Sequence, residues 1–75
     1  MKEEWDDEQM WQIRSGLEDD LNVSKYAKKE FDWRQMKQIR WGLRDGIDVT
    51  EYAKEEISGE EMSEIRFELL KEKRR

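Results

Sequence analysis

Arginines and aromatic residues are the side chains of this sequence best suited to recognition chemistry. The chain has no cysteine and no histidine, so it lacks a thiolate nucleophile, the commonest general base and the commonest zinc ligand. Its carboxylates form no catalytic pair, and no nucleophile–base set or cofactor motif accompanies them. Asp45, Gly46 and Asp48 lie close in sequence, but the ordered ligand loop of an EF-hand is missing. We therefore expect a protein that is not an enzyme and has no catalytic residues, cofactor or metal.

An arginine occupies the same position in each of three copies of a repeat, as Arg14, Arg40 and Arg66. These guanidinium groups could form a ladder that grips carboxylates or phosphates. Alternatively, each stem packs on the apolar stripe of its helix, and each charged head pairs with an acidic residue of a neighbouring helix. We favour the structural interpretation, because a repeated position is usually one that the stack itself requires.

Aromatic residues that do not recur as one residue type are better candidates for binding a partner. Trp41 and Phe67 share a repeat position that Ser15 occupies in the first copy. Helix geometry places this position about 140° from Met36. There it could pack on the neighbouring short helix, or it could form an exposed aromatic patch of the kind found at binding hot spots. Trp33 lies near Arg40 and Lys37 on the helical wheel, so it could form a cation–π shelf with them or cover the start of its helix. The candidate partner-binding residues are Trp11, Trp33, Arg40, Trp41, Arg44 and Phe67.

The elements that must position these residues follow a period of 26 residues. Periods of this size indicate stacked supersecondary units. The sequence predicts an all-α fold, a small α-solenoid-like array of long-helix/short-helix repeats closed by a C-terminal helix. Residues 1–75 would form one domain, with repeats at 5–30 and 31–56 and a partial copy at 57–75. The recurring residues are Gln9-Met10, Gln35-Met36 and Glu61-Met62; Ile13-Arg14, Ile39-Arg40 and Ile65-Arg66; and Leu17, Leu43 and Leu69.

Three capping boxes predict where the long helices start. In a capping box, an N-cap side chain and the side chain three residues later each satisfy a backbone N–H of the first turn. The predicted pairs are Asp6 with Gln9, Asp32 with Gln35, and Ser58 with Glu61.

The core is expected along one stripe of each long helix, formed in the second copy by Met36, Ile39 and Leu43. The recurring Tyr26 and Tyr52 should pack in this core with their hydroxyl groups at its edge.

Glycines mark the ends and the close contacts of the helices. Gly46 should end the second long helix in the left-handed conformation, and Asp20, which tolerates that conformation less well, holds the place in the first copy. Gly16 and Gly42 lie inside helices, where each costs about 1 kcal/mol relative to alanine. This cost indicates that another helix approaches closely at both positions.

Short helices are expected to start at Asn22 and at Asp48, the second with a capping box to Glu51. The third long helix should run to Lys71 or beyond. The two ends of the chain, Met1–Glu4 and Lys73–Arg75, should remain unanchored.

Composition restricts the class of protein and of partner. Charged residues make up 47% of the chain, but the apolar residues are strictly periodic, so the body of the chain should fold. The net charge of −5 disfavours non-specific nucleic-acid binding and favours a protein partner with a basic surface. No apolar run is long enough to span a membrane, and no secretion signal is visible, so the expected location is the cytoplasm.

Residues 31–56 carry the pattern QM-x-x-IR-x-GL-x-x-G-x-DV-x-x-YA, and residues 5–30 carry a close variant of it. The pattern resembles a short tandem repeat of uncharacterised proteins from bacterial phages and mobile elements. The resemblance covers about residues 5 to 69, and the third copy matches at Met62, Ile65, Arg66 and Leu69. It implies a mobile-element setting, in which small acidic proteins are often inhibitors of host defence systems.

The sequence therefore predicts a non-enzymatic module that binds a protein. The specific hypothesis is a phage- or mobile-element-encoded inhibitor of a host defence protein that handles nucleic acid, such as a CRISPR nuclease. Two alternatives stay open. One is a nucleic-acid-binding helical protein that uses an Arg/Trp face, and the other is a structural repeat or homodimerisation module.

Overall fold

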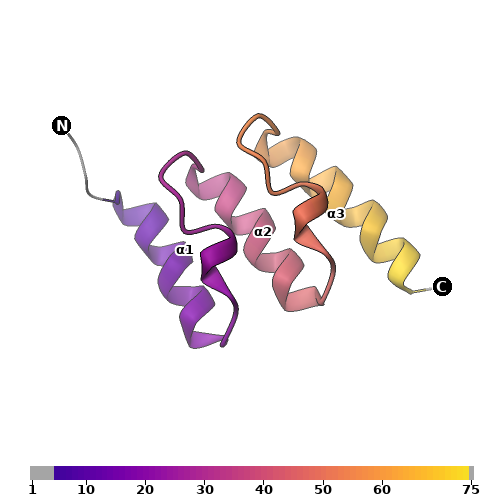
Figure 1. Cartoon of the computed structure of the whole chain (residues 1–75), viewed down its shortest axis with the longest axis horizontal. Coiled ribbons are helices and arrows are strands. Elements are labelled where there is room, and N and C mark those ends of the chain that lie inside the picture. Colours follow the sequence, from indigo (N-terminus) through magenta and orange to yellow (C-terminus); the bar gives the residue numbers. More distant parts are fainter. Residues whose placement is uncertain (1–4, 75) are drawn as a thin grey trace.

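Three long α-helices and two single-turn 3-10 helices alternate along the chain. The computed structural model describes residues 5–74, and this part is all-α, without a strand. The helices lie in a row in chain order, and each 3-10 helix lies on the same side of the row (Figure 1). The predictions for Met1–Glu4 and Arg75 lie outside the described residues. The elements are α1 (Asp7–Glu18), η1 (Val23–Lys25), α2 (Trp33–Asp45), η2 (Val49–Glu51) and α3 (Gly59–Lys73).

Each long helix begins as the capping boxes predict. The carboxylate of Asp32 accepts from the backbone N–H of Gln35 at 2.9 Å, and the Gln35 side chain accepts from the backbone N–H of Asp32 at 2.9 Å. Asp6 and Ser58 cap α1 and α3 in the same reciprocal way. The third helix runs past Lys71, so Lys73 is its last residue and does not belong to an unanchored end.

The helix ends follow the predicted turn chemistry, but the short helices are shorter than expected. Gly46 has φ of 77°, and Asp20 holds the same left-handed place in the first copy with φ of 61°. η1 and η2 each have three residues. The predicted capping box between Asp48 and Glu51 is wrong, because the Asp48 carboxylate accepts from the backbone N–H and the hydroxyl of Thr50 instead.

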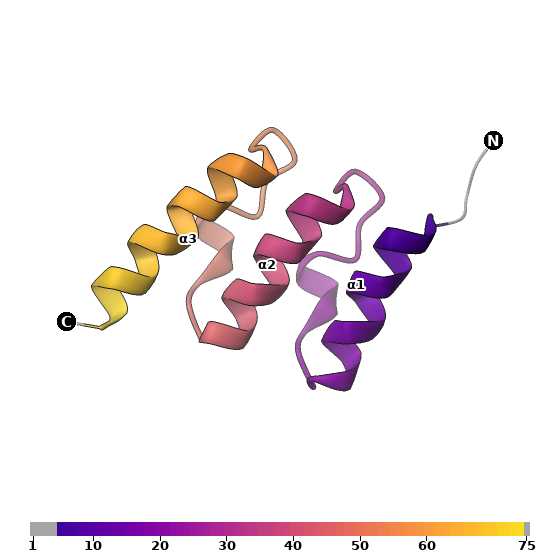
Figure 2. The ribbon, with the colours of Figure 1, turned by 180° about the vertical axis from the view of Figure 1, so that it is seen from behind.

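The core runs along the row of helices and 3-10 turns. Met36, Ile39 and Met62 are fully buried, and Leu43 is half-buried at the edge of the predicted stripe. Seen from behind in Figure 2, the long helices present one face and the 3-10 turns lie beneath them. None of the helices in residues 5–74 has the length and the apolar character that a membrane crossing needs.

Gly16 and Gly42 allow a tyrosine to reach the backbone of a helix. The Tyr26 hydroxyl donates to the carbonyl of Gln12 at 2.6 Å, and the Tyr52 hydroxyl donates to the carbonyl of Gln38 at 2.7 Å. A carbonyl inside a helix can accept this second bond, because it has two lone pairs. The predicted close approach therefore comes from the 3-10 turn of the same repeat. The hydroxyl groups do not lie at the edge of the core as predicted, since both tyrosines are fully buried.

These two tyrosines should make the protein sensitive to alkali. Burial raises the pKa of Tyr26 to about 12 and also raises the pKa of Tyr52. Because the folded state favours the protonated phenol, their contribution to stability is complete below about pH 10 and is lost as the pH rises further. Urea unfolding at increasing pH should show a falling free energy of unfolding above about pH 10. Tyrosinate absorbance that rose at the pH of a free tyrosine, with the helices still folded, would contradict this burial.

Candidate functional site

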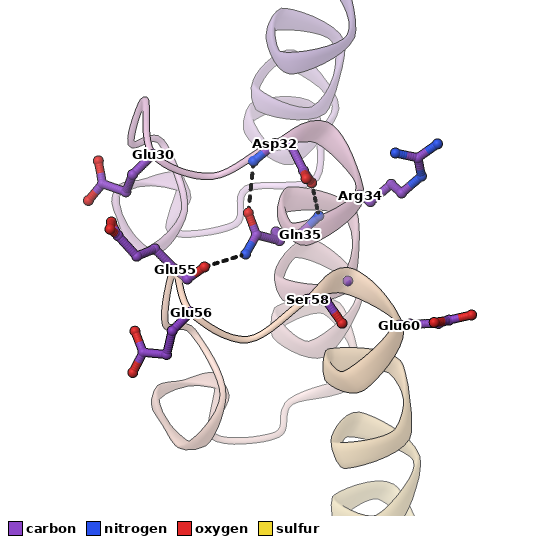
Figure 3. A pocket seen from close by; sticks show the side chains of 9 residues that line it. Glu30, Asp32, Arg34, Gln35, Glu55, Glu56, Ser58 and Glu60 are labelled. Carbon is purple, nitrogen blue, oxygen red and sulfur yellow. Dashed lines mark hydrogen bonds between the residues drawn. The ribbon is translucent and has the colours of Figure 1, made fainter.

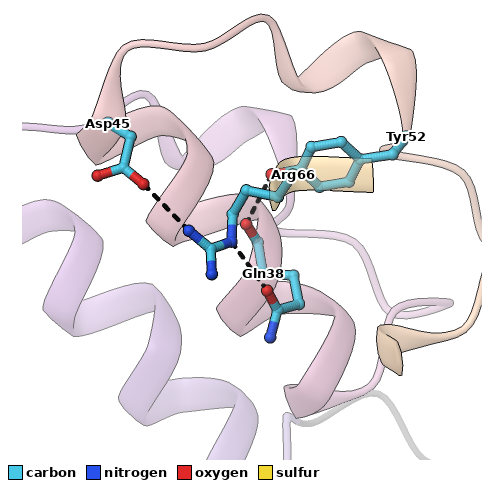
Figure 4. Close-up of polar contacts among 4 residues, drawn as sticks. All are labelled: Gln38, Asp45, Tyr52 and Arg66. Carbon is cyan, nitrogen blue, oxygen red and sulfur yellow. Dashed lines mark hydrogen bonds and ion pairs between the residues drawn. The ribbon is translucent and has the colours of Figure 1, made fainter. Parts of the chain in front are cut away.

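The repeated arginines join each long helix to the one before it. The Arg40 Nε–H donates to the side-chain oxygen of Gln12 at 2.9 Å, and the Arg66 Nε–H donates to that of Gln38 at 3.1 Å. Arg66 also pairs with Asp45 at 3.1 Å (Figure 4). These contacts support the structural interpretation, although the partner of Arg40 is a neutral amide and not the expected acidic residue.

Arg40 therefore offers little to a partner. The residue is 6% exposed, and its guanidinium lies 5.5 Å from the centre of the Trp11 ring. The sequence placed it among the candidate binding residues because helix geometry puts it at the edge of the apolar stripe. Stacking of α2 on α1 covers that edge, and repeat spacing alone does not reveal how completely.

Three of the four tryptophans lie on the long helices, on the side away from the 3-10 turns. Trp33, Lys37 and Trp41 are spaced by four residues, so they form a row along α2 that points away from Gly42, the residue against which Tyr52 packs. Trp11 has the repeat position of Lys37 and extends the row to α1. We call Trp11, Trp33, Lys37 and Trp41 the tryptophan face.

Lysine and arginine side chains lie against the rings of Trp33 and Trp41. The Lys37 ammonium lies 5.2 Å from the centre of the Trp33 ring and 5.0 Å from that of Trp41. Arg34 lies 4.9 Å from the Trp33 ring, and Arg66 lies 5.3 Å from the Trp41 ring. Cation–π attraction of this kind holds the rings and cations in place. The sequence predicted Lys37 and Arg40 near Trp33. Lys37 does lie there, whereas Arg40 lies against the Trp11 ring.

The candidate aromatic residues differ in exposure. Trp11 is 59% exposed and Phe67 is 60% exposed, whereas Trp33 and Trp41 are half-buried. Arg44 is exposed in the last turn of α2 and continues the row of Trp33, Lys37 and Trp41. The question that the sequence left open is thereby answered: Phe67 is exposed, and Trp41 is partly covered by Arg66.

An acidic groove lies where the connectors meet the starts of α2 and α3. The carboxylates of Glu30, Glu55 and Glu56 project on one side of it, and Arg34 and Glu60 project on the other (Figure 3). Gln35 forms its floor and donates to the carbonyl of Ile57 at 2.7 Å and to that of Glu55 at 3.1 Å. Within residues 5–74, these and the other acidic side chains form no group of three placed to share a metal ion.

Both surfaces suit recognition by contact, since the aromatic rings offer apolar area and the groove offers negative charge. Comparisons of the chain with protein-family models, with curated proteins and with solved structures find no match.

Proposed function

We propose that this protein is a non-enzymatic module that binds another protein through the tryptophan face. The exposure of Trp11 carries the proposal. On the same face, Lys37 lies between the rings of Trp33 and Trp41, and Arg40 lies against the ring of Trp11. Tryptophan and arginine are the residues most enriched at binding hot spots, because a pre-ordered ring buries a large apolar area at little entropic cost.

The proposed architecture behind this face is a short α-solenoid-like array. Its support is the recurrence of the same contacts at the same register, since both inter-helix arginine–glutamine bonds join residues 28 apart. An array of this kind offers a continuous lateral surface rather than an enclosed pocket. The tryptophan face lies along such a surface.

The partner in this proposal has a basic surface. The net charge of −5 and the acidic groove would steer a cationic protein toward this chain and raise its association rate. The binding should therefore weaken as the salt concentration rises.

The specific version of the proposal is inhibition of a host defence protein that handles nucleic acid, such as a CRISPR nuclease. It rests on the resemblance of the repeat to mobile-element proteins and on the acidic charge, which could occupy a groove built for nucleic acid. Cleavage of a labelled DNA by purified guide-directed nucleases, with and without this protein, tests it directly. If the protein at micromolar concentration does not inhibit any such nuclease and shows no salt-sensitive binding to one, this version of the proposal is wrong.

Trp11→Ala should weaken binding to the partner by about 2 kcal/mol, or roughly 30-fold in dissociation constant. The fold should survive, because more than half of this side chain is already exposed. Calorimetric titration measures the change, and Lys54→Ala is the control, since Lys54 is exposed beside the 3-10 turns on the opposite side. Equal affinities for the wild type and Trp11→Ala would place the binding surface elsewhere.

A nucleic-acid binder is the second candidate function, and the cations of the tryptophan face favour it. Lys37 between two tryptophan rings is an arrangement on which unpaired bases could stack while phosphates contact Lys37 and Arg44. A gel-shift experiment with single-stranded DNA and RNA at low salt decides the matter. No retardation at micromolar protein excludes this candidate.

A further inference from the structure

The side of α1 that faces away from α2 repeats a surface that the protein buries twice in its interior. Met36 of α2 and Met62 of α3 hold the same repeat position and are fully buried. Each is followed four residues later by an arginine that bonds to the preceding helix. The equivalent Met10 of α1 is 42% exposed, and Leu17 on the same stripe is 57% exposed. The α1 stripe of Met10, Arg14 and Leu17 therefore matches the surfaces that α2 and α3 use to contact the preceding helix, but no helix of residues 5–74 covers it. We call this stripe the α1 end face.

The opposite end of the row carries the complementary half. Glu64 of α3 holds the repeat position of Gln12 and Gln38, whose side chains accept from the arginine of the next helix. Phe67 holds the position of Trp41, over which the next arginine lies. Glu64 and Phe67 are exposed and border a shallow hollow with Ile65 and Glu68. We call these four residues the α3 end face.

We propose that the α1 end face of one copy docks on the α3 end face of a second copy of this chain. In the internal register, each arginine meets the residue 28 positions before it. Continuing that register from one copy to the next brings Arg14 of one copy to Glu64 of the other and places its guanidinium over Phe67. The neutral arginine–glutamine bond of the interior becomes a charge-assisted bond between the copies, and no other described side chain pairs with the Arg14 head by an ion pair.

The opposite charges of Arg14 and Glu64 and the register of the repeat both favour a second copy as the partner of the open α1 stripe. The two ends are different surfaces, so the contact is heterologous and leaves one free end of each kind. A heterologous contact that does not close gives an open row of copies, in which the tryptophan face would continue from one copy to the next. The inference goes beyond the proposed function and does not depend on it.

One contact of the interior is missing between copies, so self-association should be weaker than internal packing. Gln9 donates to the carbonyl of Phe31 at 2.7 Å, and Gln35 donates to that of Ile57 at 2.7 Å. Glu61 stands in this position in α3, and its ionised carboxylate has no N–H to donate. The association should therefore depend on protein concentration, and Glu61→Gln should strengthen it.

Sedimentation velocity of the 75-residue chain over a range of concentrations tests the proposal. The wild type should sediment as increasingly large species as the concentration rises, and salt should reduce their size. Arg14→Glu and Glu64→Arg should each raise the dissociation constant by at least about tenfold, because each places like charges at the contact. An equimolar mixture of the two variants should associate again, and so should the double variant, since both restore opposite charges.

Both substituted residues are exposed, so circular dichroism should show unchanged helix content in every variant. A wild type that stays monomeric at millimolar concentration would overturn the proposal. So would a closed dimer that grows no further, or single variants that associate as well as the wild type. Trp11→Ala should associate normally, which separates a failure of this inference from a failure of the proposed function.

Discussion

Gly42→Ala is expected to destabilise the protein by about 2 kcal/mol or more, although alanine is the better helix former by about 1 kcal/mol. An added Cβ would collide with the Tyr52 hydroxyl and would lie 2.6 Å from Cγ1 of Val49. Overpacking of a core costs roughly 1–3 kcal/mol, and displacement of the buried phenol from the Gln38 carbonyl costs a further ~1–3 kcal/mol. Urea unfolding followed by circular dichroism measures the balance.

The chain itself supplies the control for this substitution. Glu68 has the repeat position of Gly42, is exposed, and has no packed tyrosine beside it, so Glu68→Ala should change stability by less than about 0.5 kcal/mol. Adding Tyr52→Phe to Gly42→Ala removes the colliding oxygen and should recover part of the lost stability, which two independent substitutions would not do. A Gly42→Ala variant as stable as the wild type would show that η2 does not pack on α2 as described.

The sequence predicts the helix starts well because their determinants are local. Asp32 and Gln35 satisfy each other's backbone groups within a single turn, so the pattern is readable without knowledge of the rest of the fold. The left-handed residues Asp20 and Gly46 are equally local. The prediction placed the tyrosine hydroxyls wrongly, at the edge of the core. Their partners are backbone carbonyls 14 residues away, and no side-chain pattern in the sequence indicates such a contact.

The candidate site depends more strongly on how the helices stack. Arg14 and Arg40 hold the same repeat position, yet Arg14 is exposed and Arg40 is only 6% exposed. The difference arises because α2 has a helix packed on each side, whereas α1 has one on a single side within residues 5–74. Residues that occupy equivalent repeat positions therefore differ in exposure according to the position of their copy in the row.

Met36→Ala is expected to cost about 2–5 kcal/mol, enough to unfold much of a domain this small. The Met36 side chain is fully buried in the hydrophobic core, so its truncation removes apolar contact and leaves a cavity. The equivalent substitution Met10→Ala should cost less than about 1 kcal/mol, since 42% of Met10 is already in contact with water. Thermal and urea unfolding of the two variants measure the loss of stability when a methionine is removed from a buried position and from an exposed one.

The same pair of variants also tests what the open α1 stripe is for. Met10→Ala should leave the fold intact and still reduce self-association, because Met10 becomes buried only when a second copy docks on the α1 end face. If Met10→Ala proved as destabilising as Met36→Ala, the stripe would already be covered within the chain, and no half-interface would be left for a second copy. We therefore expect Met10→Ala to lose little stability and to associate clearly less than the wild type. Both the packing of α1 and the head-to-tail contact between copies require this result.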